Sequence, residues 1–368
     1  MGNVDALWST LMDEVGANKP NYKPMVQSLY PSKSRAALIG SVGAGKSAVA
    51  AGLKMAAETK VAVEEDYYCR VIEGRSEIHQ DAADLRDGHF PRKTKAFNSF
   101  AAEAGLLNTW EKKIKVLGRE KVIWRKQLQV PICDVAGEDL QQTIRQVRAQ
   151  GALGENAKQN VRNLISYVRE SDVLMVICKA TRAKGLFPRG KQLEFEQDRK
   201  LSDDPDVNLV RMLEDLINYK ENYRSRPLKG LCVIITAWDQ LKHSGVADKL
   251  GFDILRKEGI GQQDLVHFVQ ACFPAVYAVI KSARVQNVIY KPSYFEVDVN
   301  AETGKPKKWT NCNKCLDDNG NPTDCGSPII KEKSNDGGNL EWWQTLRKIS
   351  YSEDTFFDIL DWLRPFAV

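Results

Sequence analysis

The sequence predicts an α/β protein built on a doubly wound, mainly parallel sheet, and three observations support this. Apolar runs at 36–39, 173–178 and 231–235 have the continuous character of strands that are covered on both faces. Helix-compatible segments separate these runs, as connections between parallel strands require. A chain of 368 residues is long enough for one large α/β domain with insertions, or for two smaller domains.

Composition narrows the class of protein. The formal net charge of +5 is small for this length, so nucleic acid is not indicated as a partner. No run approaches the roughly 20 apolar residues of a membrane-spanning helix. The first residues lack the basic segment of a secretory signal. We therefore expect a cytoplasmic protein without a membrane span.

Further strands are predicted between and beyond these runs. Gly118 and its charged neighbours predict a hairpin that joins 114–117 to 122–124. We also expect strands at 127–133 and 275–280, and helices at 139–169, at 209–217 and near the C-terminus.

The expected organisation has four parts. Residues 1–34 form an N-terminal leader, and 35–283 form the main domain with a helical insertion at about 66–90. Residues 284–345 are polar and rich in turns, which predicts a C-terminal hairpin insertion containing cysteines. Residues 346–368 supply a last amphipathic helix that completes the main domain.

A phosphate-binding pattern follows the first strand. The pattern G-x-x-x-x-G-K-[ST] is matched at every fixed position, and a helical run from Ala48 follows it. Its residues are Gly40, Ser41, Val42, Gly43, Ala44, Gly45, Lys46 and Ser47. Backbone N–H groups of such a loop cradle a polyphosphate, Lys46 reaches the β- and γ-phosphates, and the Ser47 hydroxyl ligates Mg²⁺. The alternative is a glycine-rich turn without a ligand.

Polar residues follow other predicted strands in the order that a nucleotide site requires. Asp134 comes directly after the 127–133 strand, where its carboxylate can hold the water shell of Mg²⁺. The N–H of Gly137 can contact a γ-phosphate. Thr236 and Asp239 follow the 231–235 strand, and Ser282 and Ala283 follow the 275–280 run. Because the carboxyl ends of parallel strands meet at one edge, we expect these residues to converge on one pocket.

This order of motifs resembles the translation-factor-related (TRAFAC) class of P-loop GTPases, which contains Ras-like and G-α-like proteins. The resemblance covers most of residues 36–285. Asp134-Val135-Ala136-Gly137 is similar to the Asp-x-x-Gly switch of this class. Thr236 and Asp239 match two of the three fixed positions of its guanine motif, and Ser282-Ala283 looks like its guanine-contacting loop. The phrases around Thr94 and Asp134 also resemble a prokaryotic branch often called double-GTPases.

The resemblance implies a Mg²⁺-dependent GTPase that binds GTP and GDP and acts as a slow molecular switch. Its metal ligands would be Ser47, Thr94 and Asp134. The carboxylate of Asp239 would accept from guanine N1–H and the N2 amine, a pattern that adenine cannot offer. A protein effector is the expected partner, and the oligomeric state is left open.

Two departures from the family bear on affinity and rate. Ala237 replaces the lysine that braces the phosphate loop, which weakens the expectation of guanine over adenine. Glu138 stands where Ras-like proteins have the water-orienting glutamine, so intrinsic hydrolysis is expected to be slow. Arg92, close before Thr94, is the internal candidate for stabilising transition-state charge. A solvated loop cation is the alternative for Arg92.

Six of the eight cysteines fall into two groups, and Cys69 and Cys272 are isolated. Cys133, Cys178 and Cys232 lie in apolar runs and are expected to be small buried hydrophobes. Cys312, Cys315 and Cys325 cluster in a polar segment with spacing that suits three zinc ligands. The alternative is the reduced tip of an Asn- and Gly-rich hairpin.

Two other functions remain open at this point. An ATP-using P-loop protein, such as an ATPase or kinase, is compatible with the phosphate loop and with Ala237. A nucleotide-bound scaffold with negligible turnover is compatible with the same motifs. Neither composition nor spacing decides between these functions.

Overall fold

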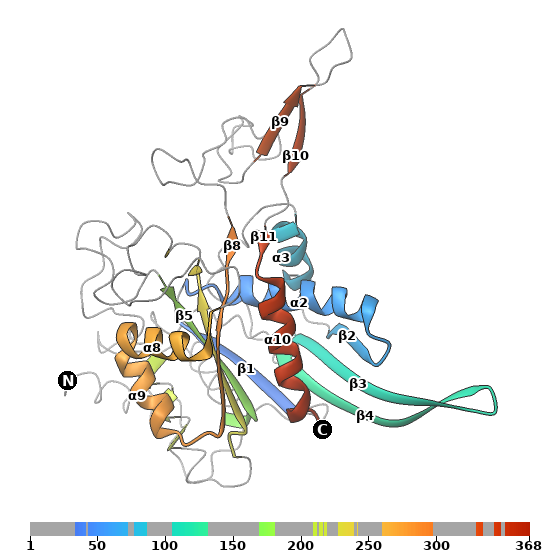
Figure 1. Ribbon diagram of the computed structural model, residues 1–368, viewed down its shortest axis with the longest axis horizontal. Helices are drawn as coiled ribbons and strands as arrows, with labels where there is room; N and C mark the ends of the chain where they lie inside the picture. Colours follow the sequence, from blue (N-terminus) through green and yellow to red (C-terminus); the bar gives the residue numbers. More distant parts are fainter. Residues whose placement is uncertain are drawn as a thin grey trace, which may run out of the picture.

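A computed structural model describes the fold, and the ranges that it describes are 34–41, 43–72, 77–86, 105–131, 169–180, 209–211, 213–215, 217–218, 227–238, 241, 260–296, 329–333, 342–346 and 350–368. Figure 1 shows a central twisted sheet with helices packed against it, and a long two-stranded ribbon that extends from one side.

The sheet has seven strands in the order β2-β3-β4-β1-β5-β6-β7. The four pairings from β4 to β7 are parallel, and the two pairings among β2, β3 and β4 are antiparallel. The strands are β1 (Ser34–Gly40), β2 (Tyr67–Ile72), β3 (Gly105–Val116), β4 (Arg119–Pro131), β5 (Val173–Lys179), β6 (Gly230–Thr236) and β7 (Asn287–Pro292). The expected mainly parallel α/β sheet is therefore present.

The central strands are buried because helices cover both faces of the sheet. Alternate side chains of a strand point to opposite faces. In β1, Ala36 and Leu38 belong to one hydrophobic cluster, whereas Ala37 and Ile39 belong to the other. Both faces of the central strands are therefore covered, as the continuous apolar runs predict.

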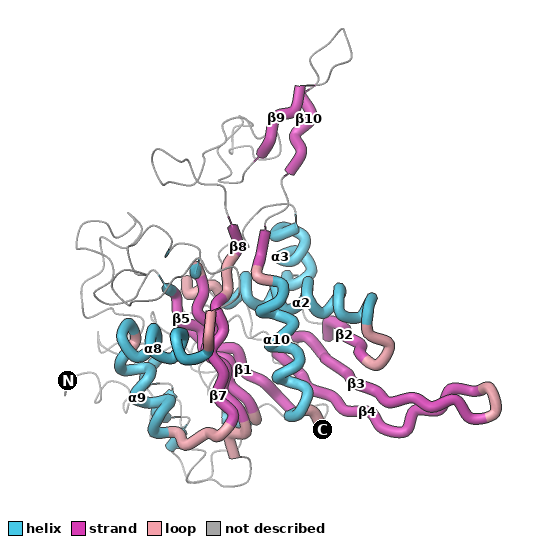
Figure 2. The backbone as a smooth tube through the Cα atoms, in the orientation of Figure 1, coloured by secondary structure: helices cyan, strands magenta, loops and turns pink. Residues whose placement is uncertain are grey.

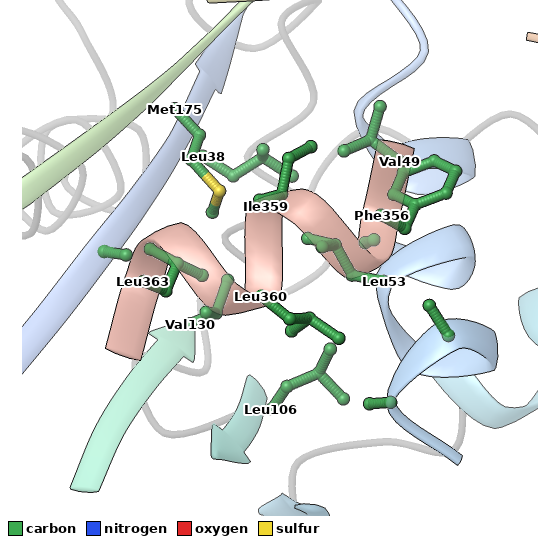
Figure 3. Close-up of a cluster of buried hydrophobic side chains, with 14 of the residues drawn as sticks. Leu38, Val49, Leu53, Leu106, Val130, Met175, Phe356, Ile359, Leu360 and Leu363 are labelled. Carbon is green, nitrogen blue, oxygen red and sulfur yellow. The ribbon is translucent and has the colours of Figure 1, made fainter. Parts of the chain in front are cut away.

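One face is covered by α2 (Lys46–Val63), α3 (Glu77–Arg86) and α10 (Glu353–Leu363). In Figure 3, the apolar side of α10 points at α2 and at strands β1, β4 and β5. The buried side chains that α10 supplies are Phe356, Ile359, Leu360 and Leu363, at helical spacing. The predicted closing helix is confirmed. The short helix η4 (Arg364–Phe366) follows it, and the backbone of Val368 then exchanges two hydrogen bonds with Gln127 of β4.

The other face is covered by α8 (Gln262–Cys272) and α9 (Pro274–Ser282), together with a helical segment whose described residues begin at 209. The prediction of a strand at 275–280 is wrong, because these residues belong to α9. Pro274 occupies the first turn of α9, where its missing N–H costs nothing. Val276, Val279 and Ile280 are buried on one side, a helical period that the alanine-rich run concealed.

The last strand of the sheet is β7, which lies within the range predicted to be the C-terminal insertion. It pairs in parallel with β6, so the main domain extends beyond residue 283. As an edge strand it exposes one row of backbone groups. The amide of Gln262 satisfies two of them, because it donates to the Tyr290 carbonyl at 2.7 Å and accepts from the Tyr290 N–H at 2.9 Å.

Two other expectations need correction. The predicted helical insertion at 66–90 contains helix α3, but residues 67–72 form β2, which pairs with β3 at the sheet edge. The strands predicted at 122–124 and 127–133 are parts of one long strand, β4. The predicted hairpin is confirmed, since β3 and β4 meet around Leu117 and Gly118. Figure 2 traces this ribbon well beyond its neighbours.

Smaller sheets complete the described fold. Strands β9 (Ile329–Lys333) and β10 (Trp342–Leu346) form an antiparallel hairpin within the predicted C-terminal insertion. Strands β8 (Phe295–Glu296) and β11 (Ser350–Tyr351) pair next to α10. Among the described helices, none alone has the length and apolar character to cross a membrane. By those two criteria the pair α8 and α9, bent by 117°, would qualify together.

The strand cysteines behave as expected where the structure describes them. Cys178 and Cys232 are buried in β5 and β6, and neither forms a disulfide. Burial raises the pKa of the Cys232 thiol, which keeps it protonated and unreactive. Cys133 lies outside the described residues.

Gly52 marks the closest approach of α2 to α10. A β-carbon at this position would lie 2.5 Å from Cζ of Phe356, whose ring is fully buried. We predict that Gly52→Ala lowers the free energy of unfolding by about 1 kcal/mol in urea titrations, because overpacking outweighs the gain in helix propensity. In a Phe356→Leu background the same change should be neutral or stabilising. A stabilised single variant would contradict this packing.

Candidate functional site

The predicted phosphate loop joins the central strand β1 to helix α2. Gly40 is the last residue of β1 and lies close to β5. A β-carbon added to it would lie 3.0 Å from Cβ of Ile177 and 3.2 Å from the Ile177 carbonyl oxygen. Gly43 and Gly45 have φ values of 64° and 95°, in the left-handed region that favours glycine. Packing therefore requires the first glycine, and backbone conformation requires the other two.

The amino end of α2 faces the loop. Gly45 caps the helix without a side-chain hydrogen bond, and the first turn contains no acidic residue. The positive end of the helix dipole is thus not neutralised by a carboxylate of its own first turn. Lys46 begins the helix, and its ammonium group donates to the carbonyl oxygens of Gly40 at 3.0 Å and Ser41 at 3.2 Å. Ser47 and Ala48 follow in the first turn, both half-buried.

A buried hydrogen bond ties the loop to the neighbouring part of the sheet. The hydroxyl of Thr236, the last residue of β6, donates to the carbonyl of Ala44 at 2.6 Å. The two residues are 192 positions apart in the chain. Thr236 was predicted from its place in the guanine motif, and the structure brings it into contact with the phosphate loop.

Four parallel strands end at the edge that carries this loop. Gly40 of β1 pairs with Ile177 of β5, and Lys179 of β5 pairs with Thr236 of β6. Strand β4 runs in the same direction and ends at Pro131, three residues before Asp134. Such carboxyl edges are where open α/β sheets bind ligands.

Ser293 completes this edge, and sequence analysis missed it. It follows β7, and its N–H donates to the carbonyl of Ile235 at 2.8 Å, while its own carbonyl accepts from the N–H of Trp238 at 3.2 Å. Its hydroxyl is buried and has no hydrogen-bond partner among the described residues. The apolar run 288–290 could have revealed β7, but the longer run at 275–280 was assigned as the last strand.

The segment after β6 turns sharply toward the core. Ala237 has a φ of 55°, which is uncommon for a residue with a β-carbon. The turn sends the Trp238 ring onto Phe268 of α8, in an edge-to-face contact with centroids 5.0 Å apart. Trp238 thereby anchors the end of this segment to helix α8.

Ser282 and Ala283 lie at the opposite edge of the sheet. They end helix α9 and lead to the start of β7, where Asn287 pairs with Gly230 at the start of β6. The Ser282 hydroxyl donates within its own helix, to the carbonyl of Val279 at 2.8 Å. The expectation that this pair follows a strand and joins the phosphate loop is wrong, because the run before it is helical.

At the amino edge of the sheet, polar side chains form hydrogen bonds and ion pairs with one another. Asp172 accepts from the Ser34 hydroxyl at 2.9 Å and from the Arg35 N–H at 3.2 Å, and it pairs with Lys229 at 3.4 Å. Arg35 in turn pairs with Glu170 at 3.0 Å. These polar groups serve the junctions of β1, β5 and β6.

The remaining predicted site residues lie outside the described residues. They are Val42, Arg92, Thr94, Asp134, Gly137, Glu138, Asp239, Cys312, Cys315 and Cys325. Within the described ranges, no group of three or more His, Cys, Asp or Glu side chains could hold a metal ion. The magnesium and zinc predictions thus remain predictions.

Comparisons with known proteins add little to this geometry. No protein-family model matches the chain, and no curated protein matches it. Among solved structures, the chain is similar to sup35 complexed with GDP, at 10% sequence identity and a TM-score of 0.23. The match covers 78% of this chain and 45% of that one, so the chain spans about half the length of sup35 in that structure. A TM-score this low does not establish a shared fold.

The tether between Thr236 and Ala44 yields a direct test. We predict that Thr236→Val, which keeps the shape but removes the hydroxyl, lowers the free energy of unfolding by about 1–2 kcal/mol in urea titrations, because a buried carbonyl loses its donor. Thr236→Ser keeps the donor and should cost less. A valine variant at least as stable as the serine variant would show that the bond contributes nothing.

Proposed function

We propose that this chain binds a guanine nucleoside triphosphate with Mg²⁺ at the loop of residues 40–48 and hydrolyses it slowly to the diphosphate and phosphate. The observation that carries the proposal is the loop itself, held at the carboxyl end of the central strand by Thr236 and followed directly by the amino end of α2. In this proposal the chain resembles the P-loop GTPases in the order of its motifs.

The geometry of the loop supports polyphosphate binding. Its two left-handed glycines turn the backbone around the amino end of α2, where helix N–H groups lack intrahelical partners. The ammonium group of Lys46 already lies on the loop, on the carbonyls of Gly40 and Ser41. A short movement of this flexible side chain would bring its charge to the β- and γ-phosphates.

Oxygen ligands for a hard cation are also available in the chain. Ser47 offers a hydroxyl in the first turn of α2, the type of donor that Mg²⁺ accepts. Thr94 and Asp134 would complete the protein ligands. Bound Mg²⁺ would neutralise charge that develops on the phosphate oxygens.

Recognition of the base would fall to the chain that follows β6 and β7. Asp239 would accept from guanine N1–H and the N2 amine. The buried hydroxyl of Ser293 is a polar group at the same edge, and in this proposal it replaces Ser282 and Ala283 as the contact from the last strand. The methyl side chain of Ala237 is too short to brace the base as a lysine would. ATP is therefore the second candidate ligand.

Turnover would be slow and would control two segments. Glu138 would orient the attacking water less well than an amide, and Arg92 would supply positive charge in the transition state. Loss of the γ-phosphate would release the segments at about 88–98 and 136–150, an order–disorder switch that a protein effector could sense.

We predict that isothermal titration finds GTP and GDP bound at least tenfold more tightly than ATP. Lys46→Ala should weaken GTP binding at least tenfold, since it removes the charge that faces the phosphates. EDTA should weaken GTP binding as well. Lys281→Gln, at the opposite edge of the sheet, is the matched control and should bind normally. Equal affinity for ATP and GTP would remove the guanine assignment and favour the ATP-using alternative.

Base recognition can be tested separately. Asp239→Asn should shift preference from guanine toward xanthine nucleotides, because an amide can donate to the additional oxygen of xanthine. An unchanged preference would place the base elsewhere.

We further predict slow release of phosphate from GTP under single-turnover conditions. Lys46→Ala should abolish the release, and Arg92→Ala should slow it about tenfold or more, because each removes charge that stabilises the transition state. Glu138→Gln should accelerate it severalfold. Absence of release with bound GTP would favour a nucleotide-bound scaffold, and release unaffected by Lys46→Ala would exclude Lys46 from the reaction.

A further inference from the structure

The ribbon formed by β3 and β4 leaves the sheet and carries a concentrated positive charge. Strand β2 pairs with β3 only up to Trp110, and β1 pairs with β4 only at Leu128 and Gln129. Residues 112–126, here called the basic arm, therefore form a two-stranded ribbon that no other strand extends (Figure 1). Five exposed residues of β3 alone extend roughly 16 Å beyond the core.

The charge of the arm accounts for the net charge of the whole chain. The arm contains seven lysines and arginines and one carboxylate, Glu120, which leaves six positive charges. The chain has a net charge of +5, so all other residues together sum to −1. The small net charge of the whole chain is therefore compatible with a strongly basic surface on the arm.

One face of the arm alternates cations with apolar side chains. Its cross-strand pairs are Lys112 with Trp124, Ile114 with Lys121, and Val116 with Arg119, and partners in such pairs lie side by side. Each pair joins one cation to one apolar residue. None of these three cations forms an ion pair with a described residue.

On the opposite face the charges are largely compensated. Glu111 pairs with Arg125, and Glu120 pairs with Lys113 at 3.6 Å. The Lys113 ammonium also lies 5.0 Å above the ring of Tyr68. Most of the uncompensated charge therefore lies on the face that also carries Ile114, Val116 and Trp124, whereas Val122 lies across from Lys113 on the opposite face.

The tip of the arm is a leucine. Leu117 is 98% exposed and has a φ of 52°, and Gly118 follows with a φ of 77°. Two such residues form the tight turn of a two-residue hairpin, whose first position favours Asn, Asp or Gly. An aliphatic side chain here gains nothing from the fold and is accessible to a partner outside the chain.

We propose that the basic arm docks on an anionic lipid bilayer, with Leu117 inserted among acyl chains and the lysines and arginines at the phosphate level. The charge favours a polyanionic partner, and the exposed apolar residues nearest the tip distinguish between the classes of polyanion. They are aliphatic (Ile114, Val116, Leu117, Val122 and Ile123), so they offer no aromatic surface for stacked bases. Trp124 lies farther from the tip and is half-buried, packed against the hydrophobic core.

The test is co-sedimentation of the full chain, without nucleotide, with lipid vesicles. The protein should bind phosphatidylcholine vesicles that contain about 30% phosphatidylserine and should not bind pure phosphatidylcholine vesicles. Each basic residue near an anionic surface contributes a factor of about five, so Arg119→Gln with Lys121→Gln should lower binding about 25-fold. Lys281→Gln with Arg284→Asn removes two charges elsewhere and should change binding less than about twofold.

Leu117→Asn separates insertion from charge. Asparagine suits the turn better than leucine, so the variant should unfold at the same or a higher temperature while its vesicle binding falls about tenfold. Undiminished binding of this variant would overturn insertion, and absence of binding to anionic vesicles would overturn the proposal outright. Tighter binding of a single-stranded RNA oligonucleotide than of anionic vesicles would assign the arm to nucleic acid instead. A dimer lost in Leu117→Asn would assign it to a second copy of the chain.

Discussion

The position of strand β1 in the middle of the sheet is the constraint on which the rest of the site depends. Strand β1 is buried on both faces, and the loop predicted to bind phosphate begins at its carboxyl end. Gly40 allows β5 to approach closely at that point, and Thr236 then holds the loop from β6. The loop is thus positioned by contacts with the core of the protein.

The polar groups at the two edges of the sheet are satisfied to different degrees. At the amino edge, Asp172 accepts from the Arg35 N–H and pairs with Lys229, and Arg35 pairs with Glu170. These interactions join the strands where they begin. At the carboxyl edge, the helix end, the lysine and the buried Ser293 hydroxyl are polar groups that a ligand could engage. This asymmetry is what a parallel sheet produces, since all its strands direct their carboxyl ends to the same side.

Strong local patterns made much of this predictable from sequence. Continuous apolar runs predicted β1, β5 and β6, and the glycine pattern predicted the loop, because few residues other than glycine tolerate the required backbone. The prediction of a strand at 275–280 was wrong because alanine and valine occur in either structure, and only burial of every third or fourth residue distinguishes the helix.

Strand β7 was missed because an edge strand is half exposed, and its sequence therefore mixes polar and apolar residues. The β2 strand lies in a segment predicted to be a helical insertion, and the strand with which it pairs, β3, is distant in sequence. The contact between Thr236 and Ala44 joins residues 192 positions apart, which no local pattern encodes.

The central claim is that the loop at 40–47 binds a triphosphate and that the residues after β6 recognise its guanine base. A crystal structure with a non-hydrolysable GTP analogue and Mg²⁺ tests it most directly. The account predicts phosphates surrounded by the amides of this loop, with Lys46 turned onto them and the guanine edge on Asp239. An empty loop in such crystals, or a base bound away from residue 239, would contradict it.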